Sequence, residues 1–592
     1  MNATASPTES AEPSDPAPRF EATGTLPATP PEAIAAAVEE LAARKDDWVA
    51  VHIEDRVTLL RRLRRDAWAA SEQLVADALK VKGVRPGSPQ EADEWSAGPY
   101  ALLRNLRLLE RSLTETRRFG APRLPVRPWA RPDGQVVAQV FPTDAWDKLL
   151  LRGYTAEVWM APEVHLDTLG DTQADAYRNK ERRPHPGKVA LVLQAGNVSS
   201  IGPMDALYKL FVEDQVVVLK TNPVNDYVGR FVERAFAALI DAGFLRVVYG
   251  GVEAGATLCE HPLVDEIHIT GSDRTHDAIV FGVGEEGRRN KAAGTPKNPR
   301  RLTSELGNVT PVIVVPGPWT DKDLERQATN IVSGLANNAG FNCVAHRVIV
   351  QHAGWDRRQD LVDAVRARMV ATPTRRAYYP GASDRMARYA DAHDHLERYG
   401  DPAAGDLPWA IVPNVDPEDR ESPCFDTEAF CGLFAETALA ADTPAEYVAA
   451  AVRFVNERLW GTLAAVLIVH PETMRDAAMA HAVDEAIAEL RYGTVVVNHF
   501  PGLAYALGSP PWGAAPGHPA TDIQSGSGVV HNTYLFSHPQ KAVVRGPFKP
   551  FPKPPWWLGN GHALSLGRQL AAFEAAPSWG KLTRLAWTAL KG

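Results

Sequence analysis

Short runs of Val, Ile and Leu recur from Lys188 onward, and their alternation with helical stretches constrains the fold more than any other feature. Runs such as "KVALVLQ", "QVVVLKT", "VTPVIVV" and "GTVVVN" have the length and composition of buried strands. Stretches such as "GPMDALYKLFVED" between them have helical spacing. This alternation predicts an α/β fold with parallel sheets. Ligands of such sheets bind beyond the carboxyl ends of the strands, so functional residues are expected in those loops.

The two ends of the chain differ from this α/β region. Residues 1–30 are rich in Ala, Pro, Ser and Thr, which predicts disorder, and residues 31–120 have the periodicity of helices with charged outer faces. The segment 547–592 is Pro-rich at first and then predicts an amphipathic helix pair. That tail either packs against the core or a partner subunit, or lies on a membrane surface.

Composition excludes several classes of protein. The 592 residues carry a formal net charge of −9, which argues against a nucleic-acid binder. The four cysteines form no CxxC pair and no disulfide framework, so no metal site is predicted and a reducing, cytoplasmic location is expected. The sequence has neither the pattern of a secretory signal nor 18 consecutive apolar residues.

Three loops carry side chains suited to catalysis. "NNAGFNCVAHRVIV" places Cys343 in a turn before an apolar run, where it is either an inert core thiol or a nucleophile. "LTSELGN" contains Glu305, which is either a salt-bridged carboxylate or a general base. "LQAGNVSSI" places Asn197 after the first clear strand, as a turn residue or as an oxyanion donor.

Further segments give these loops a familiar order. "HITGS", "TSELGN", "AGFNC", "TEAFCG" and "YGTVVVN" follow one another along the chain. In this order they resemble the motifs of the aldehyde dehydrogenase superfamily, over roughly residues 31–546. The resemblance implies a Rossmann-like cofactor domain, an α/β catalytic domain and a small β oligomerisation ribbon. The corresponding residues are 31–150 and 185–306 for the cofactor domain, 307–528 for the catalytic domain, 151–184 and 529–546 for the ribbon, and 547–592 for a C-terminal extension.

The resemblance also implies a reaction, the NAD(P)-dependent oxidation of an aldehyde to a carboxylic acid. Cys343 would form a thiohemiacetal and then a thioester, and Glu305 would activate the water that hydrolyses the thioester. The Asn197 amide and the Cys343 backbone N–H would bind the oxyanion. Alternatives remain: an acyl-thioester reductase running toward aldehyde, or an inactive member that serves as a scaffold. A homodimer or homotetramer is expected.

NAD or NADP is the cofactor that the resemblance implies. Lys220 would reach the adenosine ribose, Ser272 the pyrophosphate and Glu428 the nicotinamide ribose. The full set of expected cofactor contacts is Lys220, Gly251, Gly255, Gly271, Ser272, Leu306, Glu428 and Phe430. In "KTNP", Pro223 replaces the superfamily's glutamate, so a 2′-phosphate would meet no repulsion and NADP becomes permissible. Extra residues between Ser272 and Glu305 form either a basic loop near the phosphates or a surface excursion.

Overall fold

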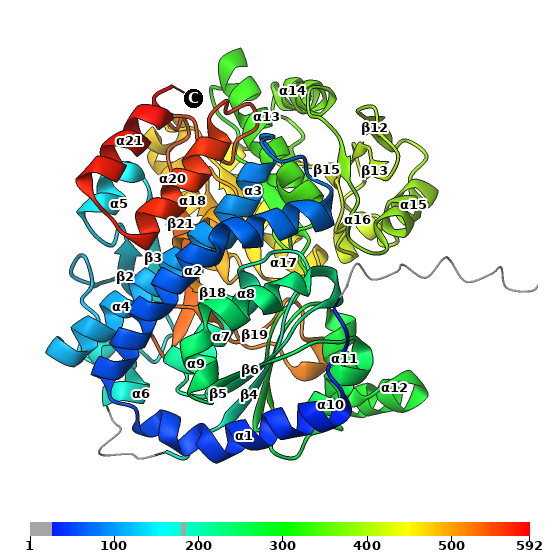
Figure 1. Ribbon diagram of the computed structural model, residues 1–592. Helices are drawn as coiled ribbons and strands as arrows, with labels where there is room; N and C mark the ends of the chain where they lie inside the picture. The colour runs from blue at the N-terminus through cyan, green and yellow to red at the C-terminus, as the bar shows by residue number, and fades with distance from the viewer. Residues whose placement is uncertain (1–25, 179–184, 592) are drawn as a thin grey trace, which may run out of the picture.

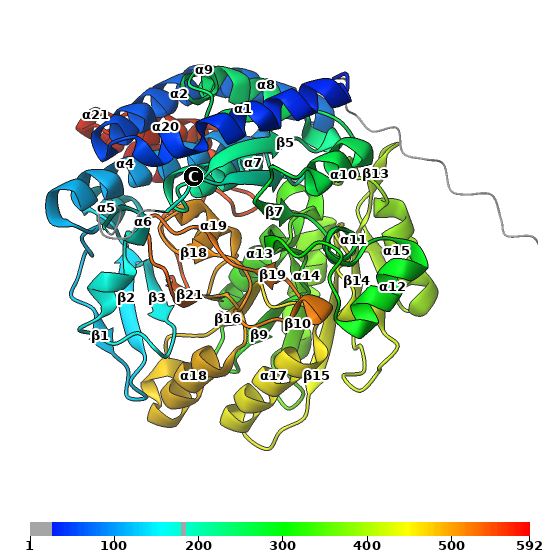
Figure 2. The ribbon, with the colours of Figure 1, turned by 90° about the horizontal axis from the view of Figure 1, so that it is seen from below.

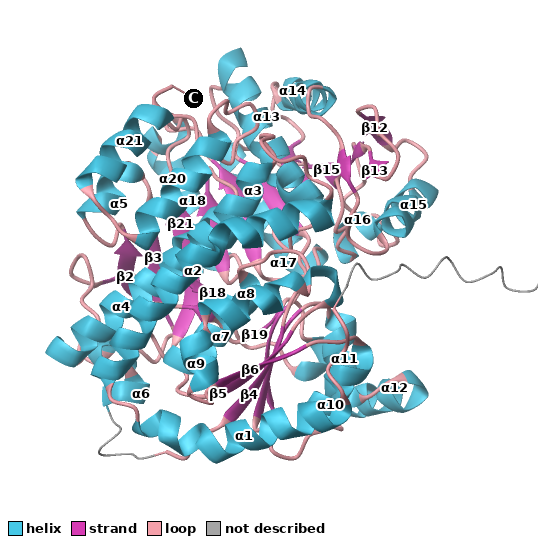
Figure 3. Cartoon of the chain, viewed as in Figure 1, coloured by secondary structure: helices cyan, strands magenta, loops and turns pink. Residues whose placement is uncertain are grey.

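The computed structural model describes residues 26–178 and 185–591, and the strands of these residues form two large sheets surrounded by helices (Figures 1 and 3). The smaller sheet has the order β19-β8-β7-β4-β5-β6, and every neighbouring pair except β19–β8 is parallel. Its strands are β4 (Val189–Leu193), β5 (Val216–Lys220), β6 (Leu245–Val248), β7 (Glu266–Thr270), β8 (Arg301–Glu305) and β19 (Gly526–Ser527). Strand order that reverses at β4 is typical of a Rossmann-like sheet.

The larger sheet has the order β1-β2-β3-β21-β17-β16-β9-β10-β15-β14-β12. Its centre is parallel and almost completely buried, whereas β1, β2, β3 and β12 run antiparallel to their neighbours. The strands are β1 (Trp129–Ala130), β2 (Val136–Phe141), β3 (Thr155–Met160), β9 (Thr310–Val314), β10 (His346–His352), β12 (Glu397–Tyr399), β14 (Trp409–Val412), β15 (Leu433–Leu439), β16 (Ala464–Ile468), β17 (Thr494–Val497) and β21 (Pro539–Arg545).

Helices cover both sheets. Figure 2 shows α1 and α2 lying with α8 and α9 over the smaller sheet. The helices that bear on the argument are α1 (Pro31–Ala50), α2 (Ile53–Lys82), α3 (Glu91–Trp95), α4 (Ala101–Phe119), α5 (Ala145–Leu150), α7 (Ile201–Phe211), α8 (Tyr227–Ala235), α9 (Ala237–Asp241), α10 (Val252–Glu260), α11 (Asp273–Phe281), α12 (Gly284–Ala293), α13 (Asp321–Ala336), α16 (Pro423–Asp426), α17 (Pro444–Arg458), α18 (Ala477–Glu489), α20 (Ala563–Ala575) and α21 (Trp579–Ala589). Among the described residues, none of the helices has the length and apolarity needed to cross a membrane.

The α/β prediction is confirmed, and the helices expected in residues 31–120 are present as α1 to α4. The disorder prediction concerns mainly residues 1–25, which lie outside the described residues. It is wrong for the last five residues of the segment, because the Thr29 N–H donates to the Tyr249 carbonyl and the Thr29 hydroxyl accepts from the Tyr249 N–H. The extra residues before Glu305 include the helix α12 rather than only a loop, since Glu, Arg, Lys and Ala favour helix there.

The ribbon includes more of the chain than the resemblance implied. Strands β1 and β2 lie within residues 31–150, yet β2 pairs with β3, and β3 pairs with β21. The boundary at residue 150 would therefore split an antiparallel pair that is buried on both of its faces. The ribbon is also continuous with the larger sheet, because β21 pairs with β17.

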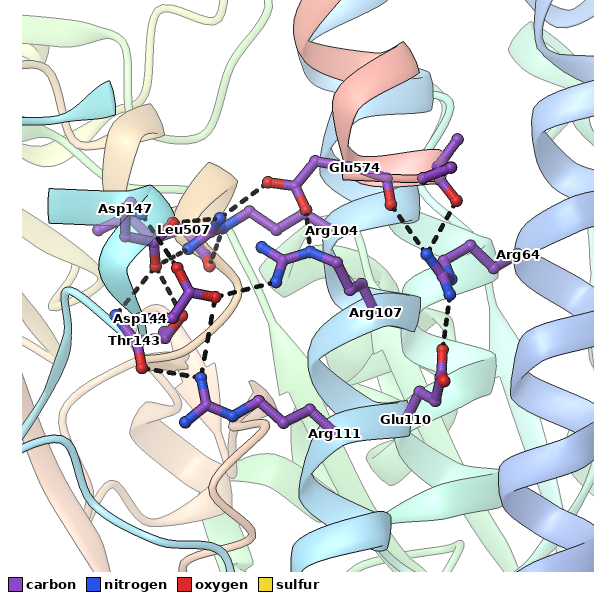
Figure 4. A network of polar contacts seen from close by, with 12 residues as sticks. Arg64, Arg104, Arg107, Glu110, Arg111, Thr143, Asp144, Asp147, Leu507 and Glu574 are labelled. Atoms are coloured by element: carbon purple, nitrogen blue, oxygen red, sulfur yellow. Dashed lines mark hydrogen bonds and ion pairs between the residues drawn. The ribbon is translucent and has the colours of Figure 1, made fainter. Parts of the chain in front are cut away.

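The C-terminal extension forms the expected helix pair and packs against the core through a buried ion network (Figure 4). Glu574 of α20 accepts hydrogen bonds from Arg104 and Arg107 of α4. Arg104 also donates two hydrogen bonds, of 2.9 and 3.0 Å, to Asp147 of α5. Arg104 is 1% exposed and Glu574 2% exposed, so charged groups without these partners would be desolvated and unpaired.

We expect Glu574→Ala to lower the free energy of unfolding by about 3 kcal/mol, because the buried guanidinium of Arg104 and the partly buried one of Arg107 each lose a carboxylate. Urea unfolding of the full chain measures the change. Glu472→Ala is the control, since Glu472 pairs with Arg475 on the surface and its loss should cost about 0.5 kcal/mol or less. An equal effect of the two substitutions would contradict the importance of the buried network.

Candidate active site

Cys343 follows the short 3₁₀ turn Asn337–Gly340 and precedes β10. Two non-glycine residues of this turn, Asn338 and Ala339, have φ angles of 50° and 58°, a conformation that L-residues rarely adopt. The turn aims the thiol across the gap between the sheets. Its Sγ lies 3.1 Å from Oε1 of Glu305, the last residue of β8. The two side chains expected to act together are thus in direct contact.

Glu305 is a buried carboxylate with an unusual protonation equilibrium. Burial, and then the negative charge of Asp205, raise its pKa to about 7, against the lowering effect of the Cys343 thiol and the Trp512 indole. Its Oε2 atom is buried and has no hydrogen-bond partner among the described residues. A carboxylate of this kind takes up and releases a proton near neutral pH, as a general base must.

The thiol of Cys343 is protonated at rest. Burial raises its pKa well above the ordinary value, and the carboxylates of Glu305 and Glu428 raise it further. The thiol therefore needs a nearby acceptor for its proton before the sulfur can act as a nucleophile. Glu305 is that acceptor by position, because the thiol already donates its hydrogen bond to Oε1.

Asn197 lies between β4 and α7 and faces the same turn. Its side-chain Nδ2 donates a 3.0 Å hydrogen bond to the Phe341 carbonyl, two residues before Cys343. One of the two amide N–H groups is thereby bound to the cysteine loop. The structure thus brings Asn197, Glu305 and Cys343 together, from two sheets and 146 residues of chain (343 − 197).

Glu428 and Phe430 lie beside this group, in the loop after α16. Burial raises the pKa of Glu428 to about 7, although Arg347 and Arg385 lower it, and its Oε1 is buried without a hydrogen-bond partner among the described residues. Its other carboxylate oxygen approaches Gly307 so closely that a Cβ there would lie 2.2 Å away. The Phe430 ring lies 5.9 Å from that of Phe341.

The remaining expected contacts lie at the carboxyl edge of the smaller sheet. Lys220 ends β5, and burial lowers its pKa to about 8, with no partner for its ammonium among the described residues. Gly251 is the N-cap of α10, and a methyl group added at Gly251 or Gly255 would meet no atom within 4 Å. Ser272 is the N-cap of α11 and follows Gly271. Leu306 is buried, and its N–H is already bonded to the Ser525 carbonyl.

These features fit a dinucleotide. The N-termini of α10 and α11 present backbone N–H groups to anions, and the space above the two glycines admits a close approach of phosphate. The unpartnered Oε1 of Glu428 and the unpartnered ammonium of Lys220 are groups that ribose hydroxyls would satisfy.

Sequence reasoning missed several residues that the structure adds to this region. Asp205 of α7 is 1% exposed and accepts a 2.9 Å hydrogen bond from Thr270 at the end of β7. A carboxylate in the otherwise apolar "GPMDALYKLF" was the available signal. Lys82 and Asp93 reach the turn before Cys343 from the N-terminal helices, and no local pattern indicated them because their partners there lie more than 100 residues away. Glu94 pairs with Lys82.

Comparison with known proteins relates part of the chain to one family. The model of the aldehyde dehydrogenase family matches residues 169–401. An N-succinylglutamate 5-semialdehyde dehydrogenase from Sphingopyxis alaskensis is 30% identical over 171 residues, which are 28% of this chain and 32% of that protein. An aldehyde dehydrogenase from a Fusarium species is 28% identical over 27% of this chain and 32% of its own length. The chain thus spans about a third of the length of each of these two curated relatives.

Solved structures match much more of the chain. The NAD-dependent aldehyde dehydrogenase from Sinorhizobium meliloti superposes with a TM-score of 0.58 over 89% of both chains, at 18% identity. The chain has the aldehyde dehydrogenase fold, and its residues 169–401 match the family model. An NADP-dependent glyceraldehyde-3-phosphate dehydrogenase from Bacillus halodurans, complexed with NADP, has a TM-score of 0.57 over 88% of this chain and 94% of its own, also at 18% identity. The aldehyde dehydrogenase fold therefore extends well beyond the segment in which sequence similarity is detectable.

We expect Asp205→Asn to lower the pKa of Glu305, because it removes a buried negative charge from the neighbourhood of that carboxylate. The readout is the pH dependence of Cys343 alkylation by iodoacetamide, followed by peptide mass spectrometry. In the unaltered protein the rate should change near pH 7, and in the variant at a lower pH. Glu213→Gln, beyond the far end of α7, should leave the midpoint in place. An unchanged midpoint in Asp205→Asn would contradict the expected charge effect.

Proposed function

We propose that the protein oxidises an aldehyde to a carboxylic acid with NAD or NADP as the electron acceptor. The observation that carries this proposal is the 3.1 Å contact between the Cys343 thiol and the buried Glu305 carboxylate. A nucleophile and a base in contact, at the meeting point of two sheets, can perform addition to a carbonyl followed by hydrolysis. The match of residues 169–401 to the aldehyde dehydrogenase family and the shared fold support the same assignment.

The first step is addition of the thiol to the aldehyde carbon. Glu305 takes the thiol proton as the Cys343 sulfur forms its bond to carbon, and the carbonyl oxygen becomes an oxyanion. The second N–H of the Asn197 amide and the backbone N–H of Cys343 are the donors proposed for that oxygen. Removing one donor of this kind usually lowers kcat by about 100- to 1000-fold.

A nicotinamide ring bound between Cys343 and Glu428 would supply the one capacity that the side chains lack, acceptance of a hydride. Glu428 would hold the adjoining ribose and Phe430 would pack beside it. Lys220 would bind the adenosine ribose, and Gly251, Gly255, Gly271 and Ser272 would surround the pyrophosphate. Leu306 would act only through its position next to Glu305, because its N–H is bonded within the protein.

Hydrolysis of the Cys343 thioester completes the reaction. Glu305 would first release the thiol proton to solvent. A water molecule placed between Glu305 and the acyl carbon would then lose a proton to the carboxylate and attack the carbon, and Glu305 would return that proton to the departing sulfur as the acid is released. The pKa of about 7 suits this proton transfer at neutral pH. The presence of Glu305 favours water over another thiol as the acyl acceptor.

The decisive experiment incubates the full chain with a panel of aliphatic and aromatic aldehydes and either NAD⁺ or NADP⁺, and follows the reduced cofactor and the acid. We expect turnover that disappears in Cys343→Ala. Glu305→Gln should lower the steady-state rate by about 100- to 10,000-fold and leave a thioester on Cys343, visible by mass spectrometry. Gln cannot take a proton, so acylation should also slow.

Two outcomes would contradict this proposal. Folded protein that reduces neither cofactor with any aldehyde would remove the dehydrogenase function and favour a scaffold. Oxidation of reduced cofactor with an acyl thioester, without the reverse oxidation of aldehydes to acids, would instead favour the reductase.

Pro223 leads to a prediction about cofactor choice. It begins a short 3₁₀ turn just after Lys220, with Asn222 as the N-cap. Pro223→Glu places a carboxylate near the proposed adenosine ribose, where a 2′-phosphate would be repelled. We expect kcat/KM with NADP to fall at least about tenfold relative to NAD. Pro223→Gln is the control, because glutamine has about the size of glutamate without its charge. An equal loss in both variants would contradict charge-based selection.

We also propose that the protein is a homodimer or homotetramer assembled through the ribbon. The support is the superfamily resemblance together with β1, an antiparallel strand at the outer end of the larger sheet whose Trp129 is 38% exposed. Sedimentation velocity of the full chain measures the mass, and a monomer at micromolar concentration would contradict this assembly.

A further inference from the structure

The cysteine turn, Asn337–Gly340 before Cys343, is held in its conformation by a buried cation at the end of helix α2. Lys82, the last residue of α2, is 4% exposed. Its ammonium lies 2.8 and 3.0 Å from the two carboxylate oxygens of Glu94. It also donates 3.0 Å hydrogen bonds to the backbone carbonyl of Asn197 and to Oδ1 of Asn338. An ammonium has three protons, and Glu94, Asn197 and Asn338 provide an acceptor for each of them.

Asn338 is the residue through which this cation reaches the turn. Its side-chain Nδ2 donates to the Asn197 carbonyl at 3.0 Å and to the Phe341 carbonyl at 3.1 Å. Its φ of 50° is a strained conformation that persists only when surrounding contacts determine it. The Tyr378 hydroxyl lies 3.1 Å from the Asn197 carbonyl oxygen and 3.0 Å from Asn338 Oδ1, and the Tyr378 ring also receives the ammonium of Lys82 at 5.2 Å.

Asp93, which neighbours Glu94 in α3, holds the backbone of the cysteine turn with a second carboxylate. Asp93 Oδ2 accepts the backbone N–H of Asn338 at 3.1 Å, and Asp93 Oδ1 accepts the side-chain amide of Asn337 at 2.9 Å. Arg375 compensates the charge of Asp93 with a contact of 2.5 Å. Thus α3 contributes two carboxylates, one directly and one through Lys82, to the turn that carries Cys343.

We propose that Lys82 is a positioning residue for the reaction. By joining the Asn197 carbonyl to the Asn338 side chain, it fixes the position of the oxyanion donor relative to the Cys343 sulfur. This inference rests on the proposed function. Lys82 touches neither substrate nor cofactor in this role. It acts through the backbone on either side of the site, where a displacement of about 1 Å can lower a rate about 100-fold.

The test begins with Lys82→Met, which keeps most of the volume and removes the ammonium. We expect kcat to fall by about 10- to 100-fold, while KM for the aldehyde changes less than about threefold. The variant loses alignment needed in the transition state and keeps the contacts that bind the substrate. Alkylation of Cys343 by iodoacetamide should become at least about threefold faster as the turn opens more often.

Two further variants separate positioning from stability. Lys82→Met leaves Glu94 buried and unpaired, so the double variant Lys82→Met/Glu94→Gln should recover much of the lost melting temperature while kcat stays low. Lys209→Met removes another buried lysine, which lies on α7, is 1% exposed and is paired with Glu213. This control should also lower the melting temperature, yet leave the alkylation rate of Cys343 unchanged.

Recovery of kcat together with the melting temperature in the double variant would overturn the proposal, because Lys82 would then be only structural. An unchanged alkylation rate in Lys82→Met would overturn it as well. If the unaltered protein oxidises no aldehyde, the proposed function falls on its own, and the alkylation series still decides whether Lys82 holds the turn.

Discussion

The backbone carbonyl of Asn197 is the point at which the two halves of the site are joined. It accepts hydrogen bonds from Lys82 and from the amide of Asn338, and the Tyr378 hydroxyl lies within hydrogen-bond distance. The Asn197 side chain meanwhile binds the Phe341 carbonyl. Because Asn197 follows β4 of the smaller sheet and Phe341 precedes β10 of the larger, these bonds link the two sheets where Cys343 and Glu305 meet. A buried carbonyl left without these donors would cost about 1–3 kcal/mol.

The site accommodates more buried negative charge than a stable core would tolerate without compensation. Glu305 and Glu428 both have a pKa of about 7, with burial as the first cause in each. At neutral pH each therefore spends part of its time protonated, which limits the repulsion between them and from Asp205. The same burial that raises these pKa values keeps the Cys343 thiol protonated. When Glu305 is ionised, the thiol and its base thus hold one proton and one negative charge between them until a substrate carbonyl is available.

The sequence predicted the parts of this arrangement that are encoded locally. Strands such as Val216–Lys220 are continuous apolar runs, so the α/β class and the loops that carry chemistry follow from periodicity and strand direction. Cys343, Glu305 and Asn197 were found because they sit in motifs that resemble a known superfamily. The β1–β2 pairing was missed because a boundary drawn from resemblance ignores which strands must bury their faces together. Lys82 was missed because its significance depends on residues 115 and 256 positions away.

The same long-range logic gives the C-terminal extension a place in the architecture. Arg568 of α20 donates a 2.7 Å hydrogen bond to Glu91 of α3 and lies over the Trp95 ring, with its guanidinium carbon 5.1 Å from the ring centre. Gly567 approaches Trp95 so closely that a Cβ there would lie 3.1 Å from the Trp95 Cβ. α3 continues directly into the π-helix Ser96–Tyr100 and α4, so it is the first turn of a longer helix, and the contacts with α20 hold that end in place. Asp93 and Glu94 of α3 hold the cysteine turn, directly and through Lys82 respectively. The C-terminal extension therefore supports the candidate active site, although it lies outside the recognised motifs.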